Sequence, residues 1–148
     1  MRALLILLYT ALTGCGLNGT GTGNPALPAS ASEPAVSLFY FACMKISACN
    51  STITAAECMS GILPLTTFAE KVGITVQPPP TVEEIENARA AGSLKADSGA
   101  EKTCTNDIGA LDCTAPGLTS GYVAGAPNPY AGAADMMPAS CTAVFPPH

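Results

Sequence analysis

VSLFYFACMKISACNSTITAAEC, residues 36–58, decides the fold class because its apolar residues recur at helical spacing. Five of them stand at positions i, i+3, i+4, i+7 and i+10, which line one face of a helix. They are Phe39, Ala42, Cys43, Ile46 and Cys49. We therefore expect a helix over about residues 35–48, followed by a turn at Asn50 and Ser51. Thr54 and Glu57 then match a capping box, which predicts a second helix that carries Cys58 and Ile62 and ends near residues 61–64.

The same signals continue along the chain. Apolar spacing predicts a helix over residues 65–72 that Gly73 ends, and QPPP at 77–80 is typical of a rigid extended spacer. Two more capping boxes, Thr81 with Glu84 and Ser98 with Glu101, predict helices over 81–91 and 98–111. Strand signals are weak, and ITV at 74–76 is the only candidate. From residue 114 the chain is rich in Gly, Pro and Ala, so we expect an irregular tail that covers the helices and is pinned by Cys141. The predicted fold class is all-α.

Six cysteines predict three disulfides, which suit a small exported domain with few large apolar residues. They are Cys43, Cys49, Cys58, Cys104, Cys113 and Cys141. Helical geometry puts the Cα atoms of Cys43 and Cys49 ~9 Å apart, beyond the ~7 Å that a disulfide tolerates, and Cys104 and Cys113 would be farther apart still if their helix continues to Cys113. Three cysteines lie on each side of the proline spacer, so full pairing needs at least one bridge across it. We expect Cys49 to pair with Cys58, and the other pairings stay open.

The start of the chain, MRALLILLYTALTGC, has one positive residue and then about ten uncharged ones before a small-residue site. This pattern predicts a secretory signal peptide over residues 1–14. Ten residues of helix rise ~15 Å against a ~30 Å hydrocarbon core, so the segment is too short for a permanent span. Residues 12–15, LTGC, resemble the lipobox of bacterial lipoproteins. The alternative is an ordinary signal peptide that is cut nearby and leaves Cys15 as a thiol.

The lipoprotein resemblance implies that Cys15 carries acyl chains that hold the protein on a lipid bilayer. Two or three chains, at ~0.8 kcal/mol per buried CH₂, anchor stably where one would be marginal. Residues 15–34 would form a flexible Gly, Pro and Ser tether, and residues 35–148 a single disulfide-rich helical domain. Gly16 stands where an aspartate often retains lipoproteins in the inner membrane, so the resemblance implies the outer membrane of the cell envelope. The spacing C-x5-C-x8-C over residues 43–58 is also similar to that of small six-cysteine bacterial lipoproteins without an assigned chemistry.

Composition and charge argue against several classes of function. The formal net charge of −5 and the lack of a basic patch argue against nucleic-acid binding. No CxxC or CxxCH motif occurs and the single histidine is His148, so we expect no metal site, no cofactor and no catalytic residue that the sequence identifies. A Ser-Lys arrangement stays open for four lysines, Lys45, Lys71, Lys95 and Lys102. Glu83, Glu84 and Glu86 are more typical of acids that complement a helix dipole than of paired catalytic carboxylates.

Three candidate functions are consistent with these sequence patterns. The favoured one is an envelope lipoprotein that acts as an interaction or structural module, bound to an unknown envelope protein or polymer. The second is an exported hydrolase that attacks envelope or surface polymers through carboxylates, and the third is a soluble secreted factor. Tyr122, Tyr130, Met136 and Met137 are the candidate partner contacts, since Tyr and Met are favoured at interfaces. Convergence of Glu57, Glu70, Asp107, Asp112 and Asp135 would favour the hydrolase.

Overall fold

The structure is a computed structural model that describes residues 37–147. Within this range it contains α-helices and short 3₁₀-helices but no strand, which confirms the all-α prediction. The α-helices are α1 (Leu38–Cys49), α2 (Ala55–Ile62), α3 (Phe68–Lys71), α4 (Val82–Ala90) and α5 (Ser98–Ala110), and the 3₁₀-helices are η1 (Ala133–Met136) and η2 (Ala139–Ala143). The strand candidate at 74–76 is wrong, because this segment is coil without a strand partner.

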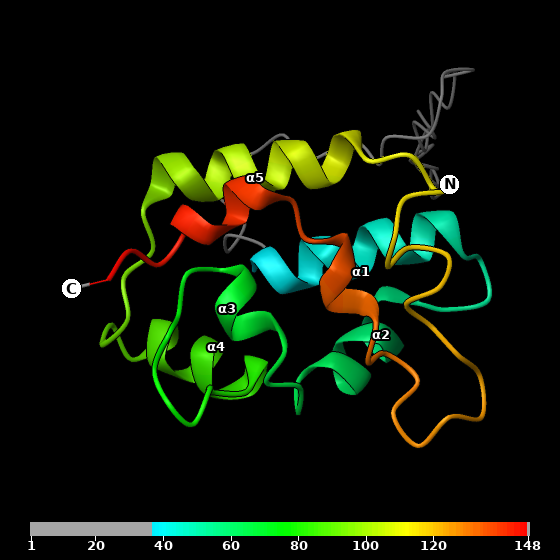
Figure 1. Ribbon diagram of the computed structural model, residues 1–148, viewed down its shortest axis with the longest axis horizontal. Coiled ribbons are helices and arrows are strands. Elements are labelled where there is room, and N and C mark those ends of the chain that lie inside the picture. Colours follow the sequence, from blue (N-terminus) through cyan, green and yellow to red (C-terminus); the bar gives the residue numbers. More distant parts are fainter. Residues whose placement is uncertain (1–36, 148) are drawn as a thin grey trace, which may run out of the picture.

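Helix α1 is the central element of the core. It lies between α5 and α2 in Figure 1 and packs against both. Its buried positions extend well around the helix, from Leu38 and Phe39 to Phe41 and Ile46. A helix that is apolar on most sides is typical of a core element rather than of a surface helix. The Phe39 ring also meets the Phe68 ring of α3 edge-on, with 5.6 Å between centroids.

Helix starts follow the predicted capping residues in two cases and differ in a third. Both capping boxes, at Thr54 and Thr81, are present with reciprocal hydrogen bonds. Helix α5 is instead capped by Asp97, whose Oδ1 accepts a 2.8 Å hydrogen bond from the Ala100 amide. The predicted box of Ser98 with Glu101 is therefore wrong by one residue. The Glu101 carboxylate pairs with Arg89 of α4 rather than with the helix start.

The tail after α5 contributes to the core instead of only covering it. Leu118, Tyr130, Val144 and Phe145 are all buried, and η2 packs against α5 and α3. In Figure 1 the tail, coloured orange to red, crosses in front of α1 before it reaches α5. Backbone hydrogen bonds hold its end, from the Phe145 amide to the Val72 carbonyl at 3.0 Å and from the Asp97 amide to the Val144 carbonyl at 2.8 Å. The expected irregular tail thus includes two 3₁₀-helices.

All six cysteines of the described residues form disulfides, as the even count predicts. The pairs are Cys43–Cys58, Cys49–Cys113 and Cys104–Cys141. The expected Cys49–Cys58 bridge is wrong, because Cys58 meets the middle of α1 while Cys49 ends that helix and faces the chain that follows α5. One bridge, Cys49–Cys113, crosses the proline spacer at 77–80, which confirms the parity argument. The pairs that helix geometry ruled out do not form.

Candidate functional site

The four predicted partner contacts do not form an exposed surface. Tyr130, Met136 and Met137 are buried in the core, and Tyr122 is partly buried against it. The Tyr130 ring covers Gly61 of α2, where a Cβ would collide with it, and lies 5.1 Å from the Tyr122 ring between centroids. Burial raises the pKa of Tyr130, with the neighbouring Tyr122 and Glu57 adding to the effect. The expectation of an exposed aromatic and methionine patch is corrected, because the domain has few other large side chains to complete its core.

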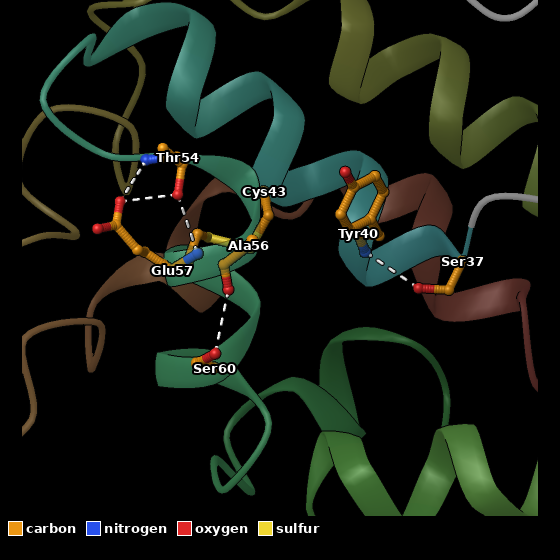
Figure 2. The surroundings of a disulfide bond; sticks show 8 residues. Ser37, Tyr40, Cys43, Thr54, Ala56, Glu57 and Ser60 are labelled. Atoms are coloured by element: carbon orange, nitrogen blue, oxygen red, sulfur yellow. Dashed lines mark hydrogen bonds between the residues drawn. A yellow bond between two sulfur atoms is a disulfide. The ribbon is translucent and has the colours of Figure 1, made fainter.

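Several acids are engaged in local hydrogen bonds. Glu57 accepts from the amide and the hydroxyl of Thr54 in the α2 cap, beside the Cys43 disulfide in Figure 2. Asp112 accepts from the amide and the hydroxyl of Thr114. These hydrogen bonds to the charged form lower the pKa of both carboxyls. Such acids stabilise helix ends and turns, and they point to structure rather than to proton transfer.

A polar cleft brings together two of the remaining acids. It has a volume of about 370 Å³ and lies between α3, the proline spacer and η1. Glu70 and Asp135 both line it, and Lys71 Nζ stands 3.7 Å from Asp135 Oδ1. Thr66, Thr67, Pro79, Ala131 and Ala134 complete the lining. Among the five acids whose convergence would favour a hydrolase, these two therefore share a site, whereas Asp107 binds the Ser140 hydroxyl at 2.6 Å elsewhere.

An apolar groove lies where the α3–α4 connection meets the C-terminal tail. Its volume is about 320 Å³, and Val76 on its rim is 60% exposed. The lining is Gly73, Ile74, Thr75, Val76, Leu94, Phe145, Pro146 and Pro147. Charged side chains are absent from this lining, and Thr75 has its only polar side chain, so the groove is mainly apolar.

A partly buried charge cluster joins α4 to α5 and the tail. Arg89 Nη2 pairs with Glu101 Oε1 at 2.8 Å, and its guanidinium carbon lies 5.8 Å from the centre of the Phe145 ring. Glu86, one turn earlier on α4, is half-buried, and its Oε1 makes no hydrogen bond within the described residues. Burial raises the pKa of the Glu86 carboxyl, even though Arg89 and the Ser37 hydroxyl act in the opposite direction. The i, i+3 spacing of Glu86 and Arg89 was the only sequence signal for this cluster.

The lysines occupy unrelated positions. Lys45 of α1 is only 2% exposed, and its Nζ donates a 3.0 Å hydrogen bond to the Gly109 carbonyl in the last turn of α5. A cation at a helix C-terminus satisfies a free carbonyl and complements the helix dipole. Lys71 faces Asp135, while Lys95 and Lys102 are exposed. Within the described range, residues 37–147, no hydrogen bond joins a serine to a lysine.

No group of three or more His, Cys, Asp or Glu within the described residues is arranged to hold a metal ion. In the same part of the chain, no helix is both long and apolar enough to cross a bilayer. Cys15 and the lipobox-like residues 12–15 lie outside the described residues, as do the predicted signal peptide and the tether. No protein-family model, no curated protein and no solved structure matches the chain.

Proposed function

We propose that this protein is a lipoprotein of the bacterial cell envelope, held on the membrane by acyl chains on Cys15, whose helical domain serves as an interaction or structural module. The observation that carries the proposal is the cysteine pairing. The six cysteines from Cys43 to Cys141 pair among themselves, so the seventh, Cys15, has no partner among them. Its place after Leu12, Thr13 and Gly14 matches the residue that lipobox sequences present for lipidation.

The three disulfides support an exported location. Structural disulfides persist in oxidising compartments such as the periplasm and the cell surface. The described part of the chain has a small core that includes four fully buried cysteines, and cross-links compensate for limited apolar burial in domains of this kind. Gly16 in place of an aspartate supports the outer membrane as the destination.

The structural hydrogen bonds of the charged side chains support the role of an interaction or structural module. Glu57 and Glu84 cap helices, Asp112 forms a turn, and Lys45 caps α5 from within the core. These hydrogen bonds stabilise the helix ends and one turn of the domain. An unknown envelope protein or polymer is the partner that we propose for it.

The polar cleft favours a second candidate, the hydrolysis of envelope or surface polymers. Its two acids, Glu70 and Asp135, come from different elements and line one cleft, so both carboxylates border the space that a substrate would occupy. The Glu70→Gln and Asp135→Asn variants would each lose hydrolysis of cell-wall glycan if this candidate is correct. Wild-type protein that leaves such glycan intact would exclude this activity on that polymer.

An unreduced peptide mass map of the protein from native membranes tests the main proposal. We expect the N-terminal peptide to begin at Cys15 with acyl chains attached, and the Cys15→Ser variant to lose both the acyl mass and the membrane association. The other peptides should show the three disulfides described above. An unmodified Cys15 in protein that fractionates with the soluble phase would contradict the anchor and favour the secreted factor.

A further inference from the structure

The three disulfides differ in their access to solvent. Four of the six paired cysteines, which make up two of the bridges, are fully buried: Cys43, Cys58, Cys104 and Cys141. In the third bridge Cys113 is exposed and Cys49 is only partly buried. A thiolate must reach a sulfur atom to exchange with a disulfide, so access controls the rate. The Cys49–Cys113 bond is therefore the bridge whose residues are most accessible to a dissolved thiol.

The elements on either side of this bond are also held together without it. Lys45, one turn before Cys49 on α1, donates its hydrogen bond to the Gly109 carbonyl, which lies four residues before Cys113. The Phe41 ring of α1 packs against the same Gly109. Both contacts are in or next to the core, and neither depends on the sulfur atoms. Opening the bond should leave α1 and α5 packed.

We propose that the Cys49–Cys113 bond is a thiol-exchange site that dithiol reductants open selectively while the two buried bridges stay intact. A reductant thiolate attacks Cys113 Sγ, the bond between the two sulfur atoms breaks, and Cys49 leaves as a thiolate that takes up a proton. The second thiol of the reductant then closes its own disulfide and releases Cys113. Two electrons pass from the dithiol to the bridge, and two cysteine thiols result.

The charge beside Cys113 adds selectivity among thiols. Asp112 precedes it, and the hydrogen bonds from Thr114 lower the pKa of its carboxyl, with Lys45 of α1 acting in the same direction. The carboxylate therefore stays ionised at neutral pH and repels attacking thiolates that carry a further negative charge. Thiols that carry no charged group besides the attacking sulfur are therefore the preferred reagents for this site. The proposal goes beyond the envelope role and holds whether or not Cys15 is acylated.

Differential alkylation of the full-length protein tests the proposal. Native protein is treated with dithiothreitol for increasing times, quenched with acid and alkylated, and the label on each cysteine is measured by peptide mass. We expect Cys49 and Cys113 to react together, at least about tenfold faster than the four buried cysteines, with the far-ultraviolet circular dichroism unchanged. One common rate for all six cysteines, or earlier reaction of a buried pair, would overturn the proposal.

A matched pair of variants tests the charge effect. Asp112→Asn removes the charge and keeps the turn, because asparagine forms the same side-chain hydrogen bonds to the residues that follow. We expect it to accelerate reduction by mercaptoethanesulfonate several-fold more than reduction by neutral mercaptoethanol. Asp107→Asn, a neutralisation on the helix of Cys104, should change neither rate. Equal acceleration with both thiols would show that the charge of Asp112 does not select the reagent.

Discussion

At the scale of single residues, Glu86 has one of the two buried side-chain polar atoms that lack a hydrogen bond within the described residues. Its carboxyl is half-buried on α4, and Oε1 lacks a hydrogen bond although Arg89 is one turn away. Arg89 divides its interactions between this acid and Glu101, and one of its own nitrogens, Nη1, is also buried without a partner. Burial of a charge without full pairing disfavours the charged form. The domain therefore carries an acid whose ionisation opposes folding.

The Glu86→Gln variant should be more stable than the wild type at pH 7. The folded-state pKa of Glu86 is raised above its unfolded value of 4.5, so the cost of its charge is fully present above the folded pKa. As the pH falls, the folded protein takes up this proton first, and the cost disappears below the unfolded pKa. Urea midpoints of the two proteins should therefore differ at pH 7 and converge near pH 4. Exposed Glu83, changed to Gln, is the control, and a pH-independent difference for Glu86→Gln would contradict this explanation.

Gly73 and Gly92 both have positive φ angles, but only Gly73 is also approached closely by other backbone atoms. Gly73 ends α3 with φ +96°, and a Cβ there would collide with the carbonyl oxygens of Thr142 and Phe145. Gly92 after α4 has φ +72° and open space around its Cα. Close approach by the tail is thus a second reason for glycine at position 73.

We expect Gly92→Ala to destabilise the domain by about 1 kcal/mol, the cost of a left-handed conformation alone. Gly73→Ala should cost roughly 2–4 kcal/mol, because the tail must also move away from α3. Urea denaturation of both variants measures the difference. Equal losses would mean that the tail does not press on Gly73.

At the scale of elements, four of the α-helices, α1, α2, α4 and α5, begin after a residue whose side-chain oxygen accepts a hydrogen bond from a free backbone amide. Local spacing identified this residue for α2 and α4, where threonine and glutamate cap reciprocally. For α5 the same spacing indicated Ser98, but Asp97 takes the cap and Glu101 turns to Arg89. A contact between helices thus competed with the local motif.

Substitution of the two adjacent residues distinguishes these caps. Asp97→Ala should destabilise the domain by about 1 kcal/mol, because it leaves the Ala100 amide without its acceptor. Ser98→Ala should be neutral or slightly stabilising, since alanine is the better helix former inside the first turn. Thermal melts of both variants provide the measurement, and the opposite order would show that Ser98 caps α5.

At the scale of the whole molecule, disulfides connect elements that are distant in sequence. Cys104–Cys141 closes 37 residues and ties α5 to η2, whereas Cys43–Cys58 closes only 15 and ties α1 to α2. All four cysteines are fully buried, so their removal leaves comparable small voids. The two bridges are therefore a matched pair in which loop length is the main difference.

The Cys104→Ala/Cys141→Ala variant should lose about 4 kcal/mol of unfolding free energy, and the Cys43→Ala/Cys58→Ala variant about 3 kcal/mol, by the loop-closure relation. Because small domains are stable by only about 5–15 kcal/mol, either loss is large. Urea titrations under non-reducing conditions check the order. A greater loss from the shorter loop would show that local packing, and not chain entropy, governs these bridges.

The sequence by itself determined the helical class, the two reciprocal caps, the turn at Gly73 and the need for one bridge across the proline spacer. These features depend on residues within a few positions of each other, or on counting, and a sequence carries such information directly. The lipobox-like residues 12–15 are also a contiguous motif, but they lie outside the described residues, and the lipid anchor stays a prediction.

Only the tertiary structure decided the disulfide partners, the burial of Tyr130, Met136 and Met137, and the placement of Glu70 and Asp135 along one cleft. Each depends on how helices and the tail pack in three dimensions, and many packings share one local pattern. Cys49 is close to Cys58 in sequence, yet the packing of α1 against α5 places Cys113 beside it. The physical reason is that core formation selects among distant contacts, whereas local spacing constrains only the element in which it occurs.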